Sequence, residues 1–71
     1  MISDEMLDNW FTYHVPQPGQ PASYEAIREA GKLLAVAIRD RTPACADQTA
    51  AIRKVREAVM TANAAIACGG H

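Results

Sequence analysis

Seventy-one residues make one small domain, whose own hydrophobic core would be marginal without a disulfide, a metal or a second chain. The two cysteines are too few for a disulfide framework and match no metal-binding spacing, so we expect free thiols and stabilisation by oligomerisation. A net charge of −1 and the lack of any apolar run near the ~18 residues of a membrane span argue against partnership with polymeric nucleic acid or a membrane.

The first predicted helix covers residues 3–12. Ser3 is a suitable N-cap, and Asp4 and Glu5 follow in the first turn, where the positive end of the helix dipole favours acidic side chains. Apolar residues then recur at helical spacing as far as Trp10, which we expect to lie in the core.

The second predicted helix covers residues 23–41, after a proline-rich loop, with Ser23 as its cap. It ends where Thr42 precedes Pro43, because a residue before proline avoids helical geometry. Its apolar stripe has three- and four-residue spacing and consists of Tyr24, Ile27, Gly31, Leu34 and Ile38. Glycine costs about 1 kcal/mol relative to alanine inside a helix, so we expect Gly31 to admit another backbone or a ligand at close range.

The third predicted helix covers residues 44–68. It begins between Pro43 and Asp47, where one option makes Thr42 the cap and Pro43 the first helical residue, and Gly69-Gly70 ends it. One apolar stripe contains Ile52, Val55, Val59, Ala62 and Ile66, and a second contains Ala51, Ala58 and Ala65. Two apolar faces exceed what one partner helix covers, so we expect part of this surface to meet another subunit.

The expected fold is therefore all-α: a three-helix protomer with a long helical hairpin, forming one domain over residues 1–71 and assembled into an oligomer. Catalysis is not expected, because no nucleophile has a base beside it, and His14 has no neighbouring carboxylate in sequence. No phosphate-binding loop or metalloprotease motif is present, and we expect neither a cofactor nor a metal.

The basic residues of the second helix allow two interpretations. On an ideal helix Arg28, Lys32 and Arg39 lie within about 40° of one another. They form either a solvated face paired with Glu25 and Glu29, or a site that captures phosphate. The third helix adds Arg53, Lys54 and Arg56.

The rings at the end of the first helix are equally open to interpretation. Phe11, Tyr13 and His14 stand where the chain leaves the helix towards prolines that hold it extended. A base stacked on an aromatic ring gains about 1–3 kcal/mol. Such a ring beside Arg28 and Lys32 would make a small nucleotide pocket, which the composition permits without requiring it.

Four segments carry a resemblance to a known family: residues 11–16 with the run Phe-Thr-Tyr-His, residues 24–28, residues 34–38 and residues 58–67 with the run Ala-Asn-Ala-Ala-Ile-Ala. In this order and spacing they resemble the phage anti-CBASS cyclic-oligonucleotide sponges, which share a helical hairpin domain with one class of anti-Thoeris sponges. The resemblance covers essentially the whole chain.

The resemblance implies a binding protein that acts in the cytoplasm of the infected bacterial host. It would sequester cyclic dinucleotides (cGAMP-like) and cyclic trinucleotides without cleaving them, and so block activation of CBASS effectors. It also implies a homohexamer, a trimer of dimers, with dinucleotide pockets at subunit contacts and trinucleotide pockets nearer the three-fold axis.

Carried to this sequence, the resemblance assigns ligand-binding roles to particular residues. Tyr13 belongs to the dinucleotide pocket, and either Arg28 or Lys32 contacts phosphate. Phe11 and His14, the neighbours of Tyr13, are further candidates for ligand binding. The surface that includes Ala62 and Ala65 belongs to the trinucleotide pocket. The main alternative is a small helical adaptor with no nucleotide ligand; a helix-turn-helix regulator is disfavoured by the acidic balance.

Overall fold

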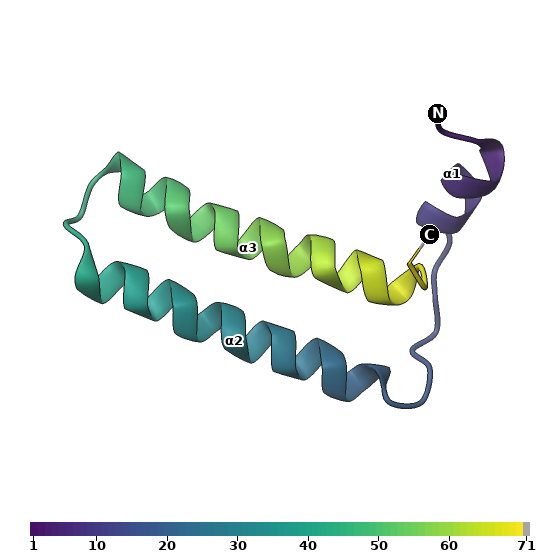
Figure 1. The fold of residues 1–71 in the computed structure, drawn as a ribbon, viewed down its shortest axis with the longest axis horizontal. Coiled ribbons are helices and arrows are strands. Elements are labelled where there is room, and N and C mark those ends of the chain that lie inside the picture. The colour runs from purple at the N-terminus through teal and green to yellow at the C-terminus, as the bar shows by residue number, and fades with distance from the viewer. Residues whose placement is uncertain (71) are drawn as a thin grey trace.

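The computed structural model describes residues 1–70, which fold into three helices and no strand: α1 (Asp4–Trp10), α2 (Gln20–Arg41) and α3 (Ala46–Ala67). Helices α2 and α3 run antiparallel, side by side, as a long hairpin (Figure 1). Helix α1 lies beyond the open end of the hairpin, close to the C-terminal end of α3 (Figure 1). The predicted all-α protomer with a long hairpin is confirmed.

Helix α1 begins as predicted and ends slightly earlier. The Ser3 hydroxyl accepts a hydrogen bond from the Met6 backbone N–H at 3.1 Å, so Ser3 is the N-cap. The helix ends at Trp10 rather than Thr12. One of its last free carbonyls, that of Asn9, accepts a hydrogen bond from Nε2 of His14 at 2.6 Å. The imidazole therefore helps to satisfy the end of α1.

The predicted start of α2 at Ser23 is wrong, because the helix begins at Gln20. Gly19 precedes it with φ 86°, in a turn closed by the Gln20 N–H and the Gln17 carbonyl at 3.0 Å. Proline and glycine at the centre of that turn suit type II geometry. Pro21 then falls in the first helical turn, where a missing N–H costs nothing because that N–H has no intrahelical partner.

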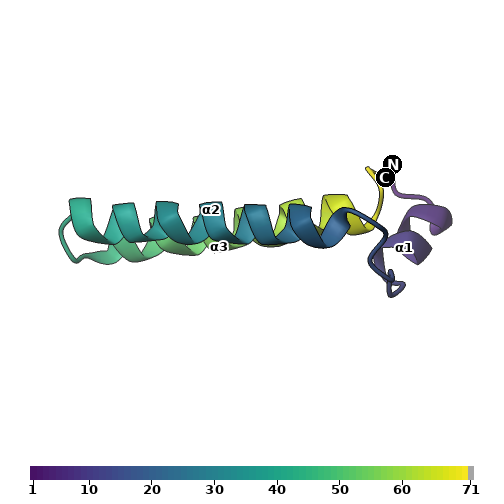
Figure 2. The ribbon, with the colours of Figure 1, turned by 90° about the horizontal axis from the view of Figure 1, so that it is seen from below.

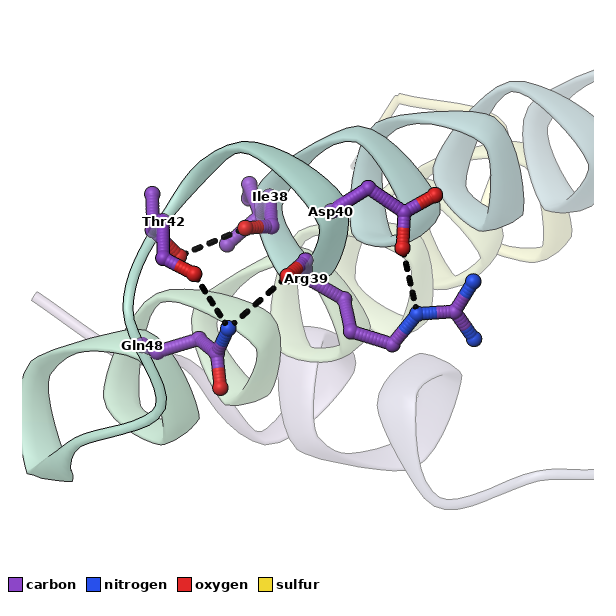
Figure 3. Close-up of polar contacts among 5 residues, drawn as sticks. All are labelled: Ile38, Arg39, Asp40, Thr42 and Gln48. Atoms are coloured by element: carbon purple, nitrogen blue, oxygen red, sulfur yellow. Dashed lines mark hydrogen bonds and ion pairs between the residues drawn. The ribbon is translucent and has the colours of Figure 1, made fainter.

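The turn between α2 and α3 fixes the register of the hairpin. Helix α2 ends at Arg41, as predicted, and Thr42 is extended with ψ 154°. The Gln48 side-chain amide donates to the carbonyls of Arg39 at 3.0 Å and Thr42 at 3.1 Å (Figure 3). One glutamine of α3 thereby satisfies carbonyls at the end of α2.

Helix α3 starts at Ala46, within the predicted window but later than residue 44. Cys45 occupies the N-cap position without a side-chain hydrogen bond. The option with Thr42 as cap and Pro43 as first residue is wrong, since the Thr42 hydroxyl donates backwards to Ile38 O at 2.6 Å (Figure 3). At the other end, Gly69 has φ 65° and follows the last turn, which confirms the predicted stop.

The apolar stripes predicted for the two long helices face each other across the hairpin. Their closest approach is at Gly31, where an added Cβ would lie 2.5 Å from Cγ2 of Val59 and 3.8 Å from Cγ1 of Val55. This confirms that Gly31 admits another helix at close range. The position that a Cβ of residue 31 would occupy is therefore taken by Val59 of α3.

The isolated protomer is thin and has no buried core. Its extents are 44 × 30 × 15 Å, and seen edge-on the hairpin is a single layer of two helices (Figure 2). The radius of gyration of 15.2 Å exceeds the roughly 11 Å of a compact domain of this length. Among residues 1–70 no side chain is fully buried, and Trp10, predicted to be core, is 41% exposed. None of the three helices is long and apolar enough to cross a membrane.

Candidate functional site

One side of the hairpin carries a groove with basic edges and an apolar floor. Arg28 and Lys32 from α2 lie on one edge and Arg56 from α3 on the other. The groove has a volume of about 240 Å³, and its floor is formed by Gly31, Ala35, Ile52, Val55, Val59 and Met60. Because Gly31 and Ala35 have little or no side chain, the groove can reach down to the helix backbone. No carboxylate is among the residues that line it.

The three cations of this groove are not neutralised within the protomer. Among residues 1–70 the only ion pair joins Arg39 and Asp40 at 2.8 Å. Glu25 and Glu29 share the outer surface of α2 with the groove cations, yet neither approaches them within ion-pair distance. The basic face is thus solvated and has acids beside it, as the first interpretation expects, but the expected ion pairs are not formed among the described residues.

Arg39 was predicted to belong to the same basic stripe, but it is engaged elsewhere. Its Nε donates to Oδ1 of Asp40, and this hydrogen bond lowers the pKa of the Asp40 carboxyl (Figure 3). Arg56, which sequence periodicity assigned only to a group of α3 cations, takes its place at the groove. The periodicity of one helix could not show this, because the pairing of two helices brings Arg56 across.

On the other side of the contact between Gly31 and Val59 lies a larger apolar groove of about 470 Å³. Ile27, Ala30 and Leu34 of α2 line it together with Ala58 and Ala62 of α3, and Lys54 is the one charged residue that lines it. Leu34 is 53% exposed, and both Ala30 and Ala58 are exposed. Of the predicted alanine stripe Ala51, Ala58 and Ala65, only Ala58 lines this groove.

The predicted stacking residues lie outside both grooves. Phe11 and Tyr13 are 84% and 81% exposed, on the loop that joins α1 to α2 at the open end of the hairpin (Figure 1). His14 beside them is half-buried through its bond to Asn9. Arg28 stands eight residues, or about 12 Å, along α2 from that end. Tyr13 does not line the basic groove of its own protomer.

The two alanines predicted at a trinucleotide pocket occupy different hollows. Ala62 belongs to the apolar groove, whereas Ala65 lines a shallow depression beside Trp10 and Cys68. Between them in sequence, Oδ1 of Asn63 is buried and has no hydrogen-bond partner. An unpartnered buried acceptor is uncommon in a native protein. The sequence shows an asparagine within an alanine-rich helix, which marks the position as unusual, but it does not indicate that the side chain is buried.

Two side-chain amides, one of a glutamine and one of an asparagine, connect the first two helices to the C-terminal end of α3. Nε2 of Gln20 donates to the Ile66 carbonyl at 3.2 Å, and Nδ2 of Asn9 donates to the Cys68 carbonyl at 3.3 Å. Both satisfy carbonyls in or just after the last turn of α3. They fix the start of α2 and the end of α1 against α3, and so position the aromatic loop.

Comparison with known proteins adds one finding. The family model described as Acb2/Tad1, hairpin domain, matches residues 4–67, which is almost the entire described chain. Comparisons with curated proteins and with solved structures gave no match.

Proposed function

This chain belongs to the Acb2/Tad1 hairpin-domain family of phage anti-CBASS and anti-Thoeris sponges, and we propose that it binds and sequesters cyclic di- and trinucleotide messengers without cleaving them. The match over residues 4–67 is the observation that carries this proposal. Sequestration in the cytoplasm of the infected host would keep CBASS effectors inactive.

The basic groove supports the proposal through its chemistry. A cyclic dinucleotide is a sugar–phosphate ring that carries two phosphodiester anions and two flat bases. Arg28 and Lys32 supply the cations, arginine by forked hydrogen bonds to phosphate oxygens and lysine as a point charge. The apolar floor beside them suits the uncharged part of such a ligand.

The dinucleotide pocket is proposed to form between protomers. Tyr13 is exposed and separate from the groove of its own chain, so a ring stacked on the ligand's base would come from a neighbouring copy. Phe11 would extend the aromatic surface, and His14 would hold the loop in place through Asn9. The proposed assembly is a homohexamer, a trimer of dimers.

The trinucleotide pocket is proposed on the α3 surface that includes Ala62 and Ala65. Small side chains there leave room for a ligand near a symmetry axis.

Thermal melting with 3′,3′-cyclic GMP-AMP and with cyclic tri-AMP tests the proposal. Ligand at 100 times its dissociation constant should stabilise the protein by about 2.7 kcal/mol. Protease digestion of the complex should then release the messenger intact. Linear nucleotide in the digest would reveal a catalytic activity, and the absence of any shift with either ligand would favour the adaptor alternative.

A further inference from the structure

Resting on the proposed function, we propose that Arg56 is a third phosphate-binding residue of the messenger site, contributed by α3 across the groove from Arg28 and Lys32. The pairing of α2 with α3 brings its side chain to the same groove, although Arg56 is far in sequence from Arg28 and Lys32. The groove would then hold a cyclic nucleotide between cations on two opposite edges.

The first support is the unused charge of Arg56. Its guanidinium makes no hydrogen bond or ion pair within residues 1–70, although Glu57 is its neighbour in sequence. No acidic side chain lines the groove, so an anion bound there would meet all three cations without a competing carboxylate.

The second support is the match between the charges and the ligand class. A cyclic dinucleotide carries two phosphodiester anions that point away from each other across its ring. Within one protomer, cations on one edge of the groove would reach only one of them. Arg56 on the opposite edge supplies a partner for the second phosphate, while Met60 and Ile52 beside it offer apolar contact. The groove therefore favours ligands with at least two phosphates over mononucleotides.

Isothermal calorimetry of Arg56→Gln with 3′,3′-cyclic GMP-AMP tests this inference. Loss of a charged hydrogen bond should weaken binding at least about tenfold. Arg53→Gln is the matched control, because it removes the same charge from an exposed position of the same helix outside the groove. AMP, with one phosphate, should lose much less affinity on the Arg56 change than the cyclic dinucleotide does.

The outcomes separate the two levels of the proposal. If the wild-type chain does not bind the cyclic dinucleotide, the proposed function fails. If the wild-type chain binds it and Arg56→Gln binds equally well, only the role of Arg56 is overturned. Equal losses in Arg56→Gln and Arg53→Gln would also overturn that role, since they would report net charge. A melting temperature within a few degrees of wild type shows that the variants are folded.

Discussion

At the scale of single residues, the aromatic ring of Tyr13 is largely exposed, so removing it should cost the protomer little stability. Its 81% exposed side chain makes little contribution to packing. We therefore expect Tyr13→Ala to leave the circular dichroism spectrum and the melting temperature nearly unchanged. If the ring stacks on a base, cyclic dinucleotide affinity should fall by roughly ten- to a hundredfold, since stacking contributes about 1–3 kcal/mol.

Calorimetry with Tyr13→Phe is the matched control, because that variant keeps the ring and should bind nearly as well as wild type. Trp10→Ala is the contrasting variant. Trp10 lines the depression between α1 and the end of α3, so its loss should lower stability first and binding only as a consequence. Wild-type affinity in folded Tyr13→Ala would end the stacking interpretation.

At the scale of elements, the contact between Gly31 and Val59 sets the distance between the two long helices. Alanine at position 31 would gain about 1 kcal/mol of helix propensity. Its Cβ, however, would lie 2.5 Å from Cγ2 of Val59, which has one strongly preferred rotamer in a helix. Overpacking of this kind costs typically 1–3 kcal/mol. We expect Gly31→Ala to destabilise the protein by about 1 kcal/mol net.

A double-mutant cycle by chemical denaturation checks this expectation. Val59→Ala removes the methyl group that collides with the new Cβ, so the double variant should be more stable than the sum of the single effects indicates. Strict additivity, or a gain in stability from Gly31→Ala alone, would show that α2 and α3 can separate freely.

The hairpin turn makes a second prediction at this scale. Gln48 donates two hydrogen bonds to carbonyls at the end of α2, so Gln48→Ala should lower the free energy of unfolding by about 1–2 kcal/mol. Gln48→Glu keeps the size but replaces the amide donor by an acceptor and should be at least as harmful. Thr49→Ala, which removes a local hydroxyl contact, should have a smaller effect on the denaturation midpoint.

At the scale of the whole molecule, the protomer leaves large apolar side chains exposed, among them Leu33, Leu34 and Met60. Because no side chain among residues 1–70 is buried and an apolar groove runs along one side of the hairpin, we expect most of the stabilising burial to come from other copies. Light scattering at micromolar concentration should give a mass well above the 7.7 kDa of one chain, near six times that value for the proposed hexamer.

Ala58→Lys places a second cation near Lys54 in the same groove and should shift the mass towards that of the single chain, because charges without an acidic partner are costly to bury. Glu57→Ala is a suitable control on the same helix, since Glu57 is exposed and lines neither groove. A wild-type mass of 7.7 kDa would refute assembly in solution. Stability measured on such an assembly will rise with protein concentration.

Much of the fold follows from the sequence because its signals are local. The Ser3 cap, the stop before Pro43 and the two glycines after α3 are decided within a few residues, and the apolar periodicity alone places both long helices. The start of α2 was missed because a cap-like Ser23 competes with a proline-glycine turn whose geometry lets the helix begin before Pro21. The order and spacing of the short motifs were enough to indicate the family.

The tertiary structure determined which residues of different helices become neighbours. The sequence gives each cation an angle on its own helix, but only the α2–α3 pairing puts Arg56 opposite Arg28. Likewise, Ala62 and Ala65 separate into different hollows. Such neighbours are determined by helix separation and crossing, which depend on many distant contacts at once, and Gly31 against Val59 is the closest of them.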